Sequence, residues 1–293
     1  MLWRAKDEGP ARSAAGSATS PTANSDTSDP IRAEDSSEKL PPSAVDFGLS
    51  DSLQPPFPFP MTATTPCALF EPLDLERLPR AEHFRTFTET VPCTFAMTAP
   101  LDVTGAVARH RSEGVPLYAL LMHAVLGVMN APDLPEFRFD WCAAQRSPDG
   151  KSESKDDVPG VWSRVGANFT HMNPKTRTFM SLWLPWIEDE AEFVTLYRET
   201  IERFGRSTRM VPQGSIPPNH VPISMIPWAA YTGFQVNFPN FRYLRPVVTM
   251  GKFGPSAADP ARLTLPFTLQ LHHATADGWH ASEAHRRIEL ATR

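Results

Sequence analysis

Residues 262–293, RLTLPFTLQLHHATADGWHASEAHRRIELATR, decide how this chain is expected to fold. Every odd position from Leu263 to Leu271 is apolar, and the even positions between them are polar or proline. A period of two over about ten residues is typical of a half-buried β-strand. The pair Asp277-Gly278 is a turn signal, and apolar residues at helical spacing follow it. The segment therefore predicts a strand, a turn and a terminal helix.

The same alternation places two neighbouring histidines on different faces of the strand. His273 falls on the apolar face and His272 on the polar face, so the strand is expected to carry one imidazole into the interior at its end. Asp277 follows four residues after His273, at the turn into the helix. A histidine can act as a general base near neutral pH, and a carboxylate can orient it. A lone histidine at a strand end is more often a packed core residue, so the position alone leaves both interpretations open.

The rest of the chain alternates expected strands and helices. Strands are predicted over 91–98 and 179–186, and helices over 104–113, 117–130 and 189–205. Pro100 is expected to end the first strand. The second helix is apolar nearly all round and should be buried, whereas the third is amphipathic. Residues 146–159 are polar and rich in turn formers, which predicts a surface insertion.

The first 60 residues differ from the rest in composition. They hold nine of the 31 prolines, ten serines, nine acidic and five basic residues, and so carry −4 of the net charge of −5. Such a segment has too few large hydrophobic residues to offset the entropy of ordering it. We expect a disordered extension over 1–62 and one folded domain over 63–293. Met61 is an alternative start of translation, which the intact mass of the native protein would reveal.

Composition excludes several classes of function. The acidic balance argues against a duplex-binding protein, and no apolar run is long enough to span a membrane. The N-terminus has no apolar signal segment, and the three cysteines are widely spaced without a C-x-x-C motif. We therefore expect a cytoplasmic protein without a disulfide framework that binds neither nucleic acid nor membrane.

Residues 272–278 fit the pattern H-H-x-x-x-D-G, which resembles the active-site signature of coenzyme A-dependent acyltransferases of the chloramphenicol acetyltransferase type. Six further segments are similar to that family, in its order and with nearly its spacing. They are Arg80-Ala-Glu-His-Phe84, Val91-Pro92-Cys93, Pro212-Gln213-Gly214, Asn219-His220, Ile223-Ser224-Met-Ile-Pro227-Trp228 and Pro246-Val-Val-Thr249-Met250-Gly-Lys252. The resemblance implies a two-layer α/β (α+β) sandwich in which helices cover a mixed sheet. It also implies a homotrimer with active sites at the subunit interfaces.

The resemblance further implies a mechanism and roles for five residues. The reaction would be transfer of an acetyl group from acetyl-CoA to an alcohol, most simply the 3-hydroxyl of chloramphenicol, without an acyl-enzyme and without a metal. His273 would deprotonate the acceptor hydroxyl, and Ser224 would donate to the oxyanion of the tetrahedral intermediate. Thr249 would hold an ordered water near that oxyanion. Asp277 would be an architectural charge paired with Arg80.

Six residues occupy the family's positions for the acceptor pocket: Thr86, Phe87, Val91, Cys93, Phe234 and Val236. Most are apolar, as a small aromatic acceptor requires. Thr86 stands where the family usually has an aromatic residue, and Phe87 replaces a tyrosine, so the acceptor itself stays open. In the trimer that the resemblance implies, His273 comes from one chain and most of this pocket from its neighbour.

Two other functions remain open at this stage. The chain could be a related coenzyme A-dependent acyltransferase acting on another small alcohol, or a non-catalytic member that only binds ligands. A metal site made of His272, His280 and His285 is a weaker idea, because the two helical histidines are five residues apart and are expected to be exposed.

Overall fold

The computed structural model describes residues 68–143, 157–238 and 241–293. The predicted extension over 1–62 and most of the predicted insertion over 146–159 lie outside these residues. No helix in the described part of the chain is long and apolar enough to cross a membrane.

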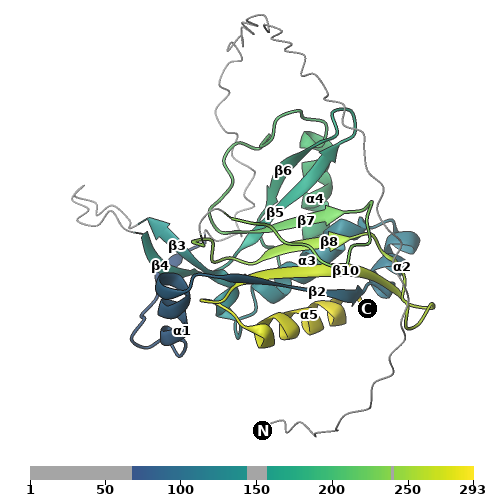
Figure 1. Ribbon diagram of the computed structural model, residues 1–293. Coiled ribbons are helices and arrows are strands. Elements are labelled where there is room, and N and C mark those ends of the chain that lie inside the picture. Colours follow the sequence, from purple (N-terminus) through teal and green to yellow (C-terminus); the bar gives the residue numbers. More distant parts are fainter. Residues whose placement is uncertain (1–67, 144–156, 239–240) are drawn as a thin grey trace, which may run out of the picture. The chain divides into compact units, whose positions relative to one another are not determined.

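The described chain folds into mixed strands and helices (Figure 1). The strands are β1 (Phe70–Pro72), β2 (Thr94–Asp102), β3 (Phe139–Ala143), β4 (Asp157–Trp162), β5 (Gly166–Asn173), β6 (Thr178–Leu184), β7 (His220–Ile226), β8 (Val247–Gly251), β9 (Gly254–Pro255) and β10 (Leu263–His272). The helices are α1 (Ala81–Arg85), α2 (Thr104–Glu113), α3 (Leu117–Met129), α4 (Glu190–Phe204) and α5 (Gly278–Thr292), with single turns η1 (Thr86–Thr90) and η2 (Pro135–Arg138). The predicted helix over 104–113 is confirmed at both ends.

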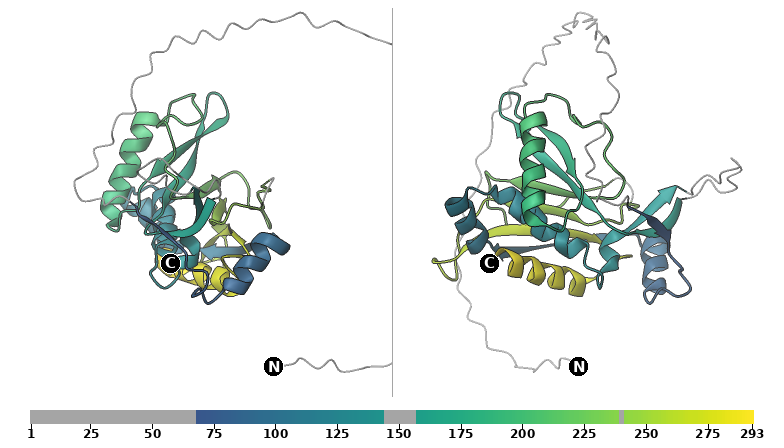
Figure 2. Two further views of the ribbon diagram at one scale, coloured as in Figure 1. Left: turned by 90° about the vertical axis from the view of Figure 1, so that its left-hand side faces the viewer. Right: turned by 180° about the vertical axis from the view of Figure 1, so that it is seen from behind.

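The strands form one large and one small sheet. The large sheet has the order β2-β10-β8-β7-β5-β6, and β9 pairs with the start of β10. Its pairs are antiparallel except β5 with β7 and β7 with β8, which are parallel. The small sheet is β1-β4-β3. Helix α3 packs between α4 and α5 against the large sheet (Figures 1 and 2). The predicted mixed sheet covered by helices is confirmed.

The predicted end of the first strand is wrong. β2 runs from Thr94 to Asp102 and passes through Pro100, which pairs with Pro266 of β10. Proline has no N–H to give to a ladder, but β2 is at the edge of the large sheet and has a neighbour on one side only. A proline is tolerated there, so it does not stop the strand.

β10 is buried on both faces, although its alternation predicted only one buried face. Leu265, Phe267, Leu269 and Leu271 belong to the main core, as expected. The polar side chains of Thr268, Gln270 and His272 are also buried, with exposed fractions of 2%, 4% and 1%. They hydrogen-bond to Tyr231, Val236 and Phe241, which cover this face of the strand. The alternation of a strand identifies its apolar face, but it does not predict that a distant segment of the chain will cover the polar face.

The main core lies between the large sheet and its helices. As predicted, α3 is apolar nearly all round and buried along its length. The amphipathic α4 buries Phe193 and Val194, and its N-cap Asp189 accepts a hydrogen bond from the N–H of Glu192 at 2.8 Å. A carboxylate at this position satisfies a backbone donor that the first helical turn leaves free.

Arg138 is a buried cation that joins α3 to the small sheet. Its guanidinium donates to the carbonyls of Met129 and Ala131, just at and beyond the end of α3, and to the carbonyl of Trp162 in β4. The three distances lie between 3.0 and 3.1 Å. A positive charge at a helix C-terminus also opposes the helix dipole favourably.

Replacing Arg138 by Met should therefore lower the free energy of unfolding by about 2–4 kcal/mol, because three buried carbonyls lose their donor. Urea denaturation at a fixed protein concentration measures the change. Arg111→Met, at an exposed position in the last turn of α2, is the matched control and should cost less than about 1 kcal/mol. Equal losses in the two variants would contradict the anchoring role of Arg138.

Candidate active site

The loop that joins β10 to α5 carries His273 and Asp277, and Arg80 holds it in place. Arg80 precedes α1, and its side chain is 12% exposed. Its Nη1 lies 3.1 Å from Asp277 Oδ2, Nε donates to the carbonyl of Ala274 at 3.1 Å, and Nη2 donates to the carbonyl of His273 at 3.2 Å. One planar guanidinium thus binds three points of the loop. The pairing of Arg80 with Asp277 that the resemblance implied is present.

A small apolar cluster packs against the loop that joins β10 to α5. Ala274 is fully buried with Phe84 of α1 and Leu244, and Phe87 and Trp141 pack against them. This cluster is separate from the main core. It ties the loop to α1 and η1, which belong to the N-terminal part of the described chain.

Asp277 is held in its ionised form. Burial alone would raise the pKa of Asp277, but the hydrogen bond and charge of Arg80, with smaller contributions from His273 and His280, hold this pKa below its usual value. Such a group adds stability at pH values above the unfolded pKa of about 3.9, and this stability is lost as the pH falls through the lower folded pKa.

The imidazole of His273 lies between two aromatic rings. Its ring centroid is 4.9 Å from that of Phe87, which stacks on it, and 4.5 Å from that of Phe95 in β2. Its Nδ1 is fully buried and lies 3.4 Å from Asp277 Oδ1 without forming a hydrogen bond, while the side chain as a whole remains 33% exposed. The accessible ring nitrogen is therefore Nε2.

His272 differs from its neighbour because both of its ring nitrogens are occupied. Nδ1 accepts from the N–H of Ala274 at 3.0 Å, and Nε2 faces the carbonyl of Phe241 at 2.9 Å. These partners require a neutral ring that carries its proton on Nε2. Burial also lowers the pKa of His272. His272 thus helps to hold the loop and Phe241 in place, whereas the Nε2 of His273 has no partner among the described residues.

Ser224 and Thr249 lie side by side in a row of hydroxyl groups that crosses the sheet. Ser224 in β7 pairs with Thr249 in β8, which pairs with Thr268 in β10, which pairs with Thr98 in β2. The Oγ1 atoms of Thr98 and Thr268 are hydrogen-bonded at a distance of 2.8 Å. The hydroxyl of Tyr231 donates to the carbonyl of Thr249 at 2.6 Å. The two predicted residues are therefore neighbours on one face of the sheet.

A single chain does not bring Ser224 to His273. Thr268 is two strands away from Ser224, and His273 lies five residues beyond Thr268, so strand geometry separates the Cα atoms of Ser224 and His273 by roughly 15–20 Å. Phe95, which contacts His273, is the register partner of Leu271 and faces away from the hydroxyl row. The predicted catalytic residues thus form two separate groups within one chain.

The six expected pocket residues divide in the same way: four lie on the segment that contacts His273 in the same chain, and two lie beside the hydroxyl row. This division differs from the expectation that most of the pocket comes from the neighbouring chain. Thr86 and Phe87 lie in η1, the exposed Val91 follows it, and the carbonyl of Cys93 accepts the N–H of His273. Burial raises the pKa of the Cys93 thiol. Phe234 and Val236 instead lie on the segment that covers the hydroxyl row, where Phe234 contacts the ring of Tyr231.

Sequence reasoning missed three residues of this region, namely Phe95, Tyr231 and Gln270. Phe95 packs on His273, Tyr231 binds beside Thr249, and Gln270 binds Val236. The polar even positions of β10 were visible in the sequence, but their partners were not.

The two helical histidines are not exposed as expected. His280 Nδ1 accepts the N–H of Asp277 at 3.1 Å, and His285 Nε2 faces the carbonyl of Pro100 at 3.1 Å. Within the described ranges, no group of three or more His, Cys, Asp or Glu residues could hold a metal ion.

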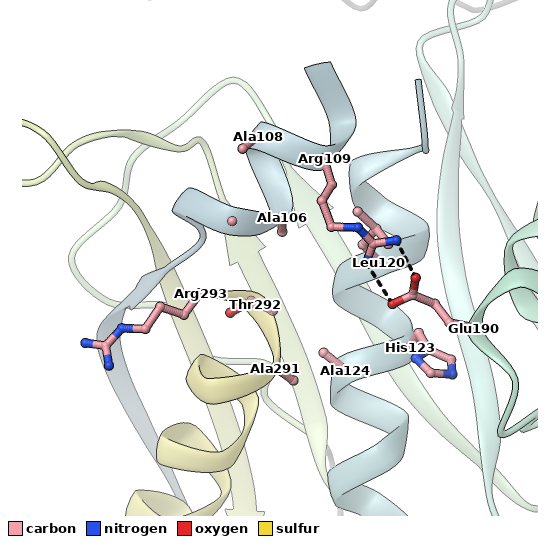
Figure 3. A pocket seen from close by; sticks show the side chains of 11 residues that line it. Ala106, Ala108, Arg109, Leu120, His123, Ala124, Glu190, Ala291, Thr292 and Arg293 are labelled. Carbon is pink, nitrogen blue, oxygen red and sulfur yellow. Dashed lines mark hydrogen bonds and ion pairs between the residues drawn. The ribbon is translucent and has the colours of Figure 1, made fainter. Parts of the chain in front are cut away.

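A cavity of about 360 Å³ lies away from both groups of predicted residues. Figure 3 shows that α2, α3 and the end of α5 line it together with Glu190 at the start of α4, which is hydrogen-bonded to Arg109. Both guanidinium groups of its lining have carboxylate neighbours, since Arg293 lies beside Asp102 and Glu289. The cavity therefore offers no unpaired arginine to a ligand.

Arg80→Ala should lower the free energy of unfolding at pH 7 by about 2–3 kcal/mol, because two carbonyls and the Asp277 carboxylate lose their donor. The difference from the wild type should begin to narrow near the unfolded pKa of about 3.9, and it should shrink further as the pH falls through the lower folded pKa of Asp277. Urea denaturation at several pH values measures both effects. Arg77→Ala, which breaks an exposed ion pair three residues earlier, is the control. A difference that stays constant with pH would contradict the ionised partnership of Arg80 and Asp277.

Comparison with known proteins places this arrangement in a family. Residues 68–288 match the family model for chloramphenicol acetyltransferase. The chain is 34% identical over 219 residues to a chloramphenicol acetyltransferase of Streptomyces acrimycini, which covers 74% of this chain and 92% of the relative. It is 31% identical over 222 residues to chloramphenicol acetyltransferase 2 of Escherichia coli, covering 75% and 96%.

The fold agrees with this sequence similarity. A solved structure of a chloramphenicol acetyltransferase superimposes with a TM-score of 0.65 at 19% identity, covering 77% of this chain and 100% of that one. The matched region contains both groups of predicted site residues. The chain belongs to the chloramphenicol acetyltransferase family.

Proposed function

We propose that the chain is an acetyl-CoA-dependent O-acetyltransferase that acetylates the 3-hydroxyl of chloramphenicol. The names of its curated relatives support the acceptor. The observation that carries the reaction type is His273, whose buried Nδ1 faces a carboxylate and whose Nε2 is accessible. A fixed imidazole with one accessible nitrogen is the group that an alcohol acceptor needs, because an alcohol is a weak nucleophile at neutral pH.

The proposed reaction proceeds by direct transfer. Nε2 of His273 takes the hydroxyl proton while the acceptor oxygen attacks the carbonyl carbon of the acetyl thioester. The tetrahedral intermediate then collapses, the carbon–sulfur bond breaks, and the proton passes from His273 to the departing thiolate. Asp277 Oδ1, 3.4 Å from Nδ1, stabilises the imidazolium that exists between these steps. Arg80 keeps both groups in place.

Ser224 supplies the donor for the oxyanion of the intermediate, and Thr249 beside it holds a water there. The sheet register supports this assignment, because the two residues are directly paired on adjacent strands. A preorganised donor of this kind is typically worth about 3–4 kcal/mol of the activation barrier.

A complete site needs a second copy of the chain. Ser224 and His273 are too far apart within one chain to act on one acceptor, so His273 of one subunit faces Ser224, Phe234 and Val236 of its neighbour. We assign the assembly as a homotrimer, in keeping with the resemblance. The sheet ends at β2 and β6, and large apolar side chains such as Trp228 and Phe179 are exposed on the single chain. Such surfaces suit an interface.

The first test is thiol release from acetyl-CoA by the purified protein. Release that depends on chloramphenicol and falls by about 10²–10⁴-fold in His273→Ala is the expected result. Ser224→Ala should lose about 10²–10³-fold.

Other outcomes distinguish the alternatives. Slow acetyl-CoA hydrolysis that requires His273 but ignores chloramphenicol would indicate another small alcohol as acceptor. A protein that stays silent in both assays, with and without His273, would be a non-catalytic family member.

A second test concerns the shared site. His273→Ala and Ser224→Ala chains carrying different tags are co-expressed, and hybrids that hold both tags are isolated. In a closed three-membered ring, one interface of each hybrid joins an intact His273 to an intact Ser224, so about one third of wild-type activity should return. Hybrids as inactive as their parents would show that the two residues act within one chain.

A further inference from the structure

Gln270 binds the main chain of Val236 at two points. Its Oε1 accepts the N–H of Val236 at 2.9 Å, and its Nε2 donates to the carbonyl of Val236 at 2.8 Å. The side chain is 96% buried, since Gln270 is only 4% exposed. A carboxamide presents a donor and an acceptor side by side, as a peptide group does. The carboxamide of Gln270 therefore forms the same two hydrogen bonds with the main chain of Val236 that a residue on a neighbouring strand would form.

This contact is the middle one of three. Two residues earlier in β10, Thr268 Oγ1 lies 3.3 Å from the hydroxyl of Tyr231, and two residues later His272 Nε2 lies 2.9 Å from the carbonyl of Phe241. Because alternate residues of a strand share a face, the three side chains form one line along β10. They attach residues 231–238 and Phe241 to the polar face of the strand.

The segment so attached carries two residues of the proposed acceptor pocket. Phe234 and Val236 lie between the first and last attachment points, and Gln270 is the only side chain among the described residues that hydrogen-bonds the Val236 main chain. Its register partners are Ala96 in β2 and Val247 in β8, which cannot replace its bonds.

We propose that Gln270 is a positioning residue that sets the affinity for the acceptor alcohol by fixing the main chain of Val236, and thereby the pocket wall formed by Phe234 and Val236. This proposal rests on the proposed function, because it takes Phe234 and Val236 as part of the acceptor pocket. Gln270 touches neither substrate. Its effect should fall on acceptor binding and leave the binding of acetyl-CoA unchanged.

The first variant is Gln270→Met, which keeps the length of the side chain and removes both bonds. The KM for the acceptor should rise about tenfold, while the KM for acetyl-CoA stays within about twofold of the wild type. Thr292→Val is the control for general destabilisation. It removes buried hydrogen bonds to the carbonyls of Asp102 and Ile288 at the far end of α5, and it should change neither KM.

The second variant, Gln270→Glu, should make the KM for the acceptor depend on pH, which general destabilisation of the fold would not do. A protonated Glu can replace both bonds of the amide, whereas an ionised Glu would face the carbonyl of Val236 without a donor. Burial raises the pKa of such a carboxyl group, so the acceptor KM should be close to that of the wild type in mild acid and rise as the pH increases. Taking the ratio of mutant to wild-type KM at each pH removes any pH dependence that the two proteins share.

The surroundings of Gln270 leave few other groups to titrate in this range. On the same face, burial lowers the pKa of His272 and raises that of Tyr231, so both stay neutral near pH 7. The partners on β2 and β8, Ala96 and Val247, carry no charge.

Hydrogen exchange of the Val236 amide tests the contact without any substrate. It should be at least about tenfold faster in Gln270→Met than in the wild type, and unchanged in Thr292→Val. Exchange that stays unchanged in Gln270→Met would overturn the attachment. Faster exchange with an unchanged acceptor KM would overturn the role in affinity. If the wild type transfers no acetyl group to any alcohol, the proposed function fails, and the exchange result still decides whether Gln270 holds the segment.

Discussion

The guanidinium of Arg80 is the interaction on which the site depends. It joins residue 80 to residues 273–277, about 200 positions later in the chain, and two of its three bonds go to main-chain carbonyls. Carbonyl oxygens do not titrate, so these two bonds persist at any pH at which the protein is folded. The bond to Asp277 adds a charge that faces His273. One side chain thus fixes the position of the loop that carries His273 and shapes its electrostatics, and lysine could not present the same three donors.

β10 owes its importance to the use of both of its faces. Its odd-numbered side chains enter the main core, and its even-numbered side chains bind the segment that carries Phe234 and Val236. Its end delivers His273 to the loop held by Arg80. Any change in the tilt of this strand would therefore move His273 and the proposed pocket wall together. The central position of β10, between β2 and β8, makes such a change costly because both ladders would have to shift.

The fold was predictable from the sequence wherever the signal was local. The strand over 263–271 was predicted from alternation and the helix over 104–113 from local helix-start residues. Both signals depend on neighbouring residues, and both elements are confirmed. The errors arose where a distant partner decides the outcome. Pro100 stays in a strand because β2 is an edge strand. The polar face of β10 is buried because residues 231–238 and Phe241 cover it. The resemblance supplied the pairing of Arg80 with Asp277, since no local pattern connects residues so far apart.

Because His273 and Ser224 are far apart within one chain, a single chain would hold only half of the proposed site. Water near either half would then have little catalytic consequence. A base that stands apart from the oxyanion donor cannot catalyse efficiently, because both must act on the same tetrahedral centre. Assembly would bring the two groups together and bury the aromatic surface around His273 at the same time. Water would then be excluded only where both groups are present, which limits unproductive hydrolysis of the thioester by unassembled chains. Under this arrangement, the sheet edges and the exposed Trp228 of the single chain would become buried when the site is completed by assembly.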